Sequence, residues 1–320
     1  FSSDPCLSND EILAQEMTKA TVQTKKTQGW KRSRRRENFA SFVLLLPYLI
    51  LMMMFAVFPV LYAFGLSFFD TIDYVFWGLT NYRAALDDYR LLPAIKNVLS
   101  FVTIWITLMV IGVTVLSLFL DTLKERTATI IRTVYYIPGA IASSAVVVLW
   151  LFLLEPQVSP FNFIFDLVGW ENRQHTFQGL GDAWIFSLMS FVAHSGGWIV
   201  VFGGALASLP GEVLEAARID GANRFQIAMR IKLPLIYRTV VLMTILSVST
   251  GLQIFVEPHL IGLAGDEFVR EDWSVTQLSF FYAFNFGDFG IAAAMSVLSL
   301  ILPFLFAFTL IFATKFYKID

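Results

Sequence analysis

The stretch from Ser208 to Arg238 reads SLPGEVLEAARIDGANRFQIAMRIKLPLIYR and is the most informative part of the sequence. Pro210 suits the first turn of a helix, and Glu212 and Glu215 would then lie in early turns, where the helix dipole favours acidic side chains. Gly221 is expected to end this helix, because glycine adopts positive φ angles without strain. The stretch therefore predicts a short helix from near Pro210 to Gly221.

A second short helix is expected to follow it. Phe225 and Met229 share one face of that helix at spacing i, i+4, and Leu233-Pro234 is expected to break it and to begin the next apolar segment. Each helix is shorter than about 12 residues and is too short to be stable alone in water. The two helices pack either on this chain's own helices or in a groove on another protein, and the residues alone leave both readings open.

Six long apolar runs surround this loop and predict membrane spans. The chain has 57% hydrophobic and only 15% charged residues, with a mean hydropathy of +0.66, whereas soluble domains have about 45–50% apolar and about 25% charged residues. A span needs about 20 mostly apolar residues, and six runs meet this length: 39–69, 98–120, 134–154, 183–207, 239–262 and 289–314. Pro47 and Pro59 are expected to kink the first run unless they lie at its ends.

The positive charges indicate the orientation of these spans. If both termini lie on one side, that side holds residues 1–38, 121–133, 208–238 and 315–320, with 18 of the 23 lysines and arginines. Because cytoplasmic loops carry the excess of Lys and Arg, both termini and the loop 208–238 are expected in the cytoplasm. Residues 1–38 read as a disordered basic tail and residues 39–320 as the membrane domain. The basic run 31–36 precedes an apolar segment, so it indicates orientation and not nucleic-acid binding.

The loop also resembles a known family motif. Glu215-Ala216-Ala217 with Asp220-Gly221-Ala222, followed about eight residues later by Ile231-Lys232-Leu233-Pro234, is similar to the EAA loop of permease subunits of binding-protein-dependent ABC importers. The family usually has Phe three residues before this Ile, where the present chain has Ala228; Phe225 or Met229 would supply the missing bulk.

Other segments extend the resemblance over nearly everything from Phe39 onward. The segments Trp77–Arg83 (WGLTNYR), Ile137-Pro138 at the opening of the third span, and Phe289–Ser296 at the opening of the sixth are similar to sugar permeases. The resemblance implies an all-α integral membrane fold of the type I ABC importer permease class, with about six transmembrane helices. It is to the first member of paired carbohydrate permeases, such as those for maltose, trehalose or glycerol-3-phosphate.

The resemblance also implies a mechanism and a set of partners. In this family the EAA loop is the coupling helix that docks on the ATPase. The partners expected are a second homologous permease, two ABC ATPases that bind ATP and Mg, an extracytoplasmic solute-binding protein and membrane lipid. The permease itself is expected to be no enzyme, to bind no cofactor, and to lie in a bacterial or archaeal plasma membrane. The residues expected at the ATPase joint are Glu215, Ala216, Ala217, Asp220, Gly221, Phe225, Met229, Leu233 and Pro234.

Polar residues inside spans are candidates for contact with a solute, because such groups are costly in lipid. Hydroxyl, amide and aromatic side chains suit a sugar, which has apolar ring faces and many hydroxyl groups. The candidates are Ser249, Gln253, Asn285, Tyr282, His194 and Glu257. For each of them taken singly, the simpler role is hydrogen bonding between helices or a position at the aqueous boundary.

Three other classes of membrane protein fit the same residues less well. An ion-coupled secondary transporter is the main alternative; it is expected to show a buried mid-span acid or repeated halves, and neither is visible. A membrane enzyme would need a catalytic or metal constellation, but His175, His194 and His259 are scattered with no metal spacing, and the single cysteine, Cys6, lies in the polar tail. A structural scaffold would leave the 208–238 loop unexplained.

Overall fold

The computed structural model of the chain describes residues 42–71, 73, 75–141, 143–264 and 269–314. The chain divides into two compact units after Tyr62. The described part of the first unit, residues 42–62, is helical, and the second unit holds all other described residues. The expected basic tail, residues 1–38, lies outside the described residues.

The regular elements of the described residues are helices, with one isolated bridge between Phe69 and Phe76, so the all-α prediction is confirmed. Five helical segments of the described chain are each long and apolar enough to cross a membrane, and they are Phe42–Leu66, Leu91–Leu120, Asp182–Ala207, Tyr237–Leu263 and Phe289–Ala313. They match five of the six expected spans. The last is α17 (Phe289–Ala313), which starts where the sequence placed it and ends one residue earlier.

The remaining expected span, the third (134–154), is not a single helix. The structure has α6 (Glu125–Ala140) and α7 (Ser143–Leu153), bent by 100° relative to each other. Pro138 and Gly139 fall in the last turn of α6, and Ile141 is already extended. A proline lacks the N–H that continues a helix, and a glycine weakens the turn, so Ile137-Pro138 ends one helix and does not open a span.

The second span is longer than expected. It comprises α4 (Leu91–Leu108), a π-helical turn η2 (Met109–Val113) and α5 (Thr114–Leu120). Pro93 lies in the first turn of α4, where a missing N–H costs little.

The first span contains a π-helical turn, η1 (Met53–Val57), directly before α2 (Phe58–Leu66). Within it the Phe58 N–H reaches back to the Met53 carbonyl. Pro59 lacks an N–H and crowds the carbonyl of the preceding turn, so a locally widened turn replaces regular α-helix there.

The fifth span is interrupted inside its length. It consists of α14 (Tyr237–Gly251) and α15 (Val256–Leu263), with a non-helical step over residues 252–255. Gly251 packs directly on Trp105, since a Cβ there would come within 2.5 Å of the indole ring. The expected span 239–262 is therefore confirmed, and its helix is interrupted near the end of the run.

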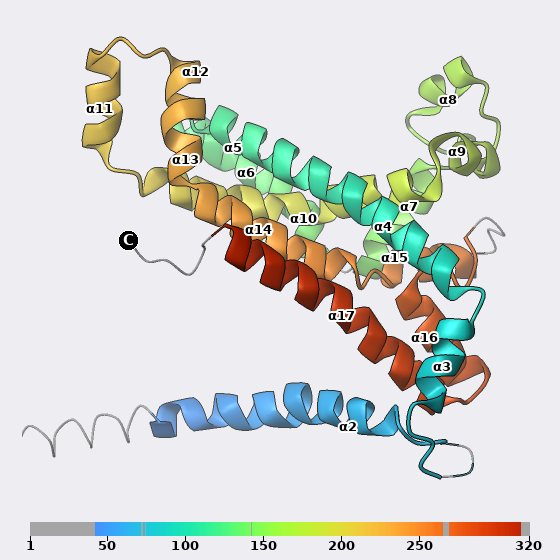
Figure 1. Cartoon of the computed structure of the whole chain (residues 1–320). Helices are drawn as coiled ribbons and strands as arrows, with labels where there is room; N and C mark the ends of the chain where they lie inside the picture. The colour runs from blue at the N-terminus through green and yellow to red at the C-terminus, as the bar shows by residue number, and fades with distance from the viewer. Residues whose placement is uncertain (1–41, 72, 74, 142, 265–268, 315–320) are drawn as a thin grey trace, which may run out of the picture. The chain divides into compact units, whose positions relative to one another are not determined.

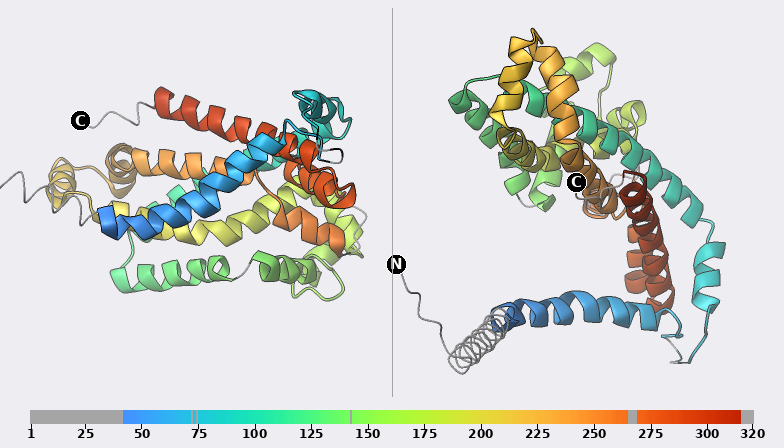
Figure 2. Two further views of the ribbon diagram at one scale, coloured as in Figure 1. Left: turned by 90° about the horizontal axis from the view of Figure 1, so that it is seen from below. Right: turned by 60° about the vertical axis from the view of Figure 1, so that its left-hand side comes forward.

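Close packing around α10 (Asp182–Ala207) holds the second unit together. The long helices α4, α10, α14 and α17 run alongside one another (Figures 1 and 2), and Phe101, Trp105 and Phe186 are fully buried between them. On the other flank α10 crosses α6 at glycines: a Cβ on Gly139 would lie 2.5 Å from the Ala193 carbonyl oxygen. Small residues allow this approach, and in lipid such van der Waals packing drives helix association.

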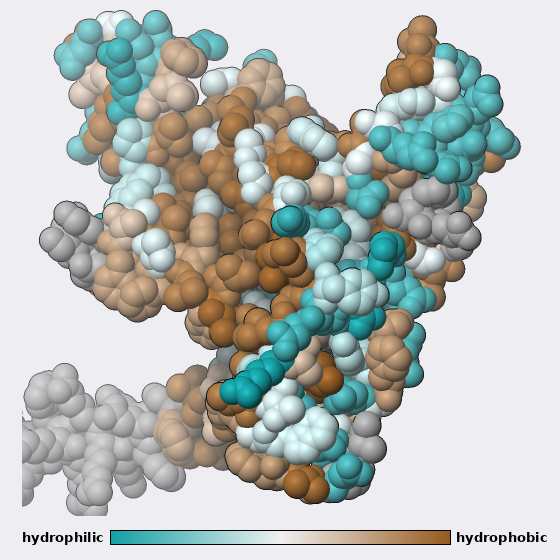
Figure 3. Space-filling view, turned by 45° about the vertical axis from the view of Figure 1, so that its right-hand side comes forward, coloured by the Kyte–Doolittle hydropathy of each residue, from teal (hydrophilic) through white to brown (hydrophobic). Residues whose placement is uncertain are grey.

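Short helices extend from the two ends of these long helices. At one end lie α11 (Gly211–Ile219), α12 (Arg224–Ile227), the π-helical turn η3 (Ala228–Lys232) and α13 (Leu233–Leu235). At the other end lie α3 (Thr80–Asp87), α8 (Asn162–Val168), α9 (Arg173–Leu180) and α16 (Val275–Asn285) (Figure 1). Hydrophilic residues gather on the α11–α12 end and around α8 and α9, with hydrophobic residues between them (Figure 3).

Candidate functional site

Residues 211–235, hereafter the hairpin, form two helical arms that run in opposite directions (Figure 1). The first arm, α11, ends at Gly221, which has a φ of +80°. The Ala222 N–H donates to the Ala217 carbonyl and the Gly221 N–H to the Arg218 carbonyl, at 3.0 and 3.1 Å. These two bonds are the Schellman arrangement, so the expected end of this helix at Gly221 is confirmed.

The second arm begins with a capping box and continues past the proline. The Asn223 side chain accepts from the Gln226 N–H, and the Gln226 side chain accepts from the Asn223 N–H, both at 2.8 Å. The expected break at Leu233-Pro234 is wrong, because helical turns run on to Leu235. Pro234 has no N–H to donate, and a π-helical turn, η3, directly precedes α13, in which this proline lies. The chain leaves the helical conformation at Ile236 instead.

The hairpin exposes large apolar side chains. Ile219 is 86% exposed and Phe225 is 73% exposed, and Met229 is also exposed. Glu215, Ala216, Asp220 and Pro234 are exposed as well, Leu233 is half-buried, and Ala217 is the buried member of the expected set. Two short helices that present such side chains gain little from this chain's own packing, and the exposed surface suits a protein partner.

One ion pair ties the hairpin to a distant segment. The Lys232 ammonium group contacts the Asp121 carboxylate, which follows the second span directly. The pair borders a cavity of about 440 Å³ that also contains Arg218 and Arg224. Sequence reasoning missed this pair, since 111 residues separate its members.

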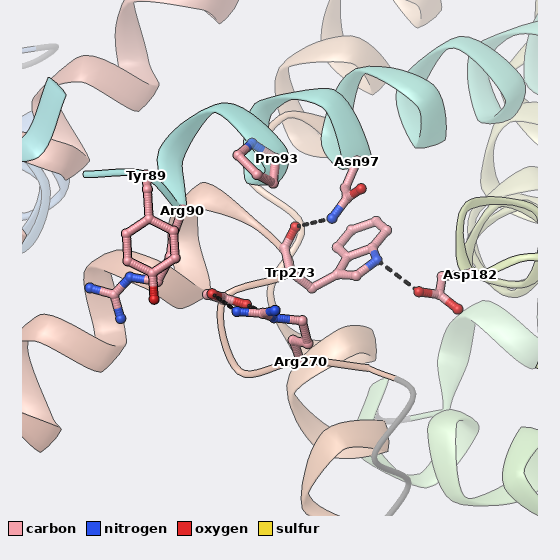
Figure 4. Close-up of a pocket in the computed structure, with 8 residues that line it drawn as sticks. Tyr89, Arg90, Pro93, Asn97, Asp182, Arg270 and Trp273 are labelled. Atoms are coloured by element: carbon pink, nitrogen blue, oxygen red, sulfur yellow. Dashed lines mark hydrogen bonds and ion pairs between the residues drawn. The ribbon is translucent and has the colours of Figure 1, made fainter. Parts of the chain in front are cut away.

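A second cavity, of about 230 Å³, lies at the opposite end of the long helices, and several polar side chains line it (Figure 4). The Trp273 indole donates to Asp182 at 3.2 Å, and the Asn97 amide donates to the Trp273 carbonyl at 3.2 Å. Arg270 pairs with Asp272 at 2.8 Å on the rim of the cavity. These contacts join the start of α4, the start of α10 and the loop before α16.

Beside this cavity Asp88, Arg90 and Tyr282 form a cluster. The Arg90 guanidinium donates to both Asp88 oxygens, at 3.1 and 2.9 Å, and the Tyr282 hydroxyl donates to Asp88 at 2.8 Å. Burial opposes the charge on Asp88, but the hydrogen bonds from Arg90 and Tyr282 outweigh it and hold the pKa of Asp88 below its usual value. Burial and the bond to Asp88 raise the pKa of Tyr282.

The expected solute residues fall at separate places in the structure. His194 and Glu257 line one cavity of about 70 Å³ at the α6–α7 bend. Gln253 lies in the break between α14 and α15, and its amide donates to the Ser249 carbonyl at 3.1 Å. Tyr282 is held by Asp88, as described above.

Asn285 lines a further cavity, of about 380 Å³, between α15 and α16. Phe280 and Phe284 form its aromatic wall, with ring centroids 4.5 Å apart, and His259 meets Phe280 at 5.0 Å. Sequence reasoning named Asn285 but not α16 itself. A signal was present, because Ser274 and Gln277 form a capping box at its start.

Comparisons with known proteins agree with this architecture. Residues 114–314 match the family model described as "Binding-protein-dependent transport system inner membrane component". The chain is 30% identical over 272 residues to the osmoprotective compounds uptake permease protein GgtC of Synechocystis sp., covering 80% of this chain and 92% of that protein. It is 25% identical to the trehalose/maltose transport system permease protein MalF of Thermococcus litoralis, covering 87% and 93%.

A further relative and a solved structure are also similar to this chain. The arabinooligosaccharides transport system permease protein AraP of Halalkalibacterium halodurans is 24% identical, covering 93% of this chain and 94% of that protein. The crystal structure of a bacterial ABC transporter that imports the acidic polysaccharide alginate contains a similar chain. The TM-score is 0.71, with 17% identity, covering 88% of this chain and 96% of that chain.

Proposed function

Because the chain belongs to the family of binding-protein-dependent transport system inner membrane components, we propose that it forms half of the import pathway for a sugar or sugar-like solute. Relatives named for arabinooligosaccharides and for trehalose/maltose support this solute class. A second homologous permease completes the pathway, and an extracytoplasmic binding protein delivers the solute. Both termini lie in the cytoplasm of a bacterial or archaeal cell, and the long helices cross its plasma membrane.

The single observation that carries the proposal is the exposed apolar surface of the hairpin. The side chains of Ile219 and Phe225 are largely exposed and make little contact with this chain. They lie on two helices that are too short to be stable alone. A cleft on an ATPase subunit would bury both side chains. The sequence contains no G-x-x-x-x-G-K-[ST] phosphate loop, so we assign ATP and Mg to two separate ATPase subunits.

The solute pathway is assigned to the expected polar residues. Gln253 and Ser249 lie where the fifth span is broken, and unwound backbone inside a span is tolerated where it lines a cavity. His194 and Glu257 face a common cavity, and Asn285 lies beside an aromatic wall that suits a sugar ring. Tyr282 is assigned a supporting role beside the solute pathway, because its hydroxyl already donates a hydrogen bond to Asp88.

Purification of the tagged chain in mild detergent, followed by mass spectrometry and reconstitution, tests the proposal. The expected result is co-purification of a phosphate-loop ATPase and a second six-span protein, and solute uptake that needs ATP. Uptake driven by an ion gradient in the absence of any ATPase would instead identify a secondary transporter. That outcome would overturn the assignment of the hairpin as well.

A further inference from the structure

The ion pair between Lys232 and Asp121 joins two segments with different roles. Lys232 closes η3, the middle of the hairpin's second arm, and Asp121 follows the last residue of the second span. Their side chains are 16% and 20% exposed. A pair shielded to this degree is less screened than a surface pair, and removing one partner leaves the other charge poorly solvated.

The two arms of the hairpin are not held equally. In the first arm, only Ala217 is buried. The second arm contributes the buried Ile227, and Ile236 is buried directly after it; Ala228 packs against the same core cluster that contains Leu118 and Leu120. The ion pair lies on this second arm, at the cytoplasmic end of the second span in the proposed topology.

We propose that Lys232 and Asp121 are positioning residues that transmit movement of the hairpin to the second span. This inference rests on the proposed function, because it requires an ATPase that moves the hairpin. Neither residue touches the solute. When the first arm is displaced, the ion pair makes the second arm and the end of the second span move together, and without it the hairpin can move while the span stays in place.

The surrounding charges set the design of the test. Arg218 and Arg224 border the same cavity, and both could approach Asp121 if Lys232 alone were removed. A double-mutant cycle resolves this, since it measures the interaction of the two residues and not the loss of either charge. Removing both also leaves no unpaired charge behind.

The experiment uses the complete transporter in liposomes and measures the ratio of solute imported to ATP hydrolysed. The variants are Lys232→Met, Asp121→Asn and the double variant. Lys124→Met is the matched control, because Lys124 is exposed and has no acidic partner among the described residues. The ratio is not changed by a merely structural defect, since loss of assembled complex lowers uptake and hydrolysis together.

We expect each single variant to lower the ratio at least about fivefold, the small end of typical coupling between sites. The double variant should be no worse than either single variant, and the control should match the wild type. Unchanged ratios in both single variants, or losses that multiply in the double variant, overturn the inference while leaving the proposed function intact. If the wild type itself shows no ATP-dependent uptake, both fail.

Discussion

Gly221 is the residue at which backbone conformation limits the hairpin most directly. Its φ of +80° is accessible to glycine, and a Cβ there would meet nothing within 4 Å. The constraint is therefore one of backbone angle and not of space. Proline would fix φ near −65° and would remove the N–H that donates to Arg218.

We therefore expect Gly221→Pro to leave membrane insertion intact and to abolish ATP-dependent uptake. Gly211→Pro is the matched control, because Gly211 is the first residue of α11 and a Cβ there also meets nothing, and proline is favoured at that position. Uptake measured in liposomes compares the two. Wild-type uptake by Gly221→Pro would contradict the role given to the hairpin.

Asp88 offers a second prediction about a single residue. Its side chain is 2% exposed and is paired with Arg90, whereas the pair of Asp272 with Arg270 has the same i, i+2 type of spacing but leaves Arg270 70% exposed. Asp88→Asn should lower the free energy of unfolding by about 1–3 kcal/mol. Asp272→Asn should change it by about 0.5 kcal/mol or less. Thermal unfolding in detergent measures both.

The pH dependence follows from the sign of the shift. The pKa of Asp88 is lowered from 3.8 in the folded protein, so its stabilisation is fully present above the unfolded-state pKa. It is lost as the pH falls through the folded-state value. The stability difference between wild type and Asp88→Asn should thus shrink below about pH 4. A difference that stays constant down to pH 2 would refute the low pKa.

At the scale of elements, hydropathy predicted the spans well and their interruptions poorly. The runs 183–207 and 289–314 became α10 and α17 with small changes at the ends. The runs 134–154 and 239–262 were broken, because hydropathy averages over about 20 residues while Pro138 and Gly251 act over one turn. Local signals gave a mixed result at the hairpin: Gly221 ended its helix as predicted, but Leu233-Pro234 did not break the second arm.

The residues of the candidate site also differ in how well the sequence predicted them. The residues of the hairpin are neighbours in sequence, so their pattern predicted the hairpin before the structure was known. The contact of Lys232 with Asp121, and the sharing of one cavity by His194 and Glu257, depend on how distant helices pack. No sequence spacing encodes that packing.

The crossing of α6 and α10 yields a prediction at this scale. A Cβ on Gly196 would collide with the backbone of Tyr135 and Tyr136, whereas one on the next residue, Gly197, would meet nothing within 4 Å. Backbone cannot move aside as a flexible side chain can. Gly196→Ala should therefore destabilise the protein by about 1–3 kcal/mol, and Gly197→Ala should be close to neutral. Equal unfolding temperatures for the two variants would contradict the packing described.

At the scale of the whole molecule, charge placement predicts which ends of the helices face the cytoplasm. Lysines and arginines concentrate on the loops at the hairpin end, and the loops around α8 and α9 carry few of them. The structure places the hairpin and α8 and α9 at opposite ends of the long helices of the second unit (Figure 1). The orientation itself follows from the preference of positive loops for the cytoplasm.

Cysteine labelling tests that orientation, since the chain has the single cysteine Cys6. In a Cys6→Ser background, Leu167→Cys and Ile219→Cys report the two ends; these residues are 83% and 86% exposed, so neither change disturbs packing. A membrane-impermeant maleimide added to intact spheroplasts should label Leu167→Cys and leave Ile219→Cys unlabelled, because the proposed topology places the hairpin in the cytoplasm. The spheroplasts express this chain without the ATPase subunits, so that no partner covers Ile219. Detergent should then make Ile219→Cys reactive, which shows that the membrane protected it. Labelling of Ile219→Cys from outside would place the hairpin on the extracytoplasmic side, where no ATPase could bind it. That result would refute the proposed transport mechanism.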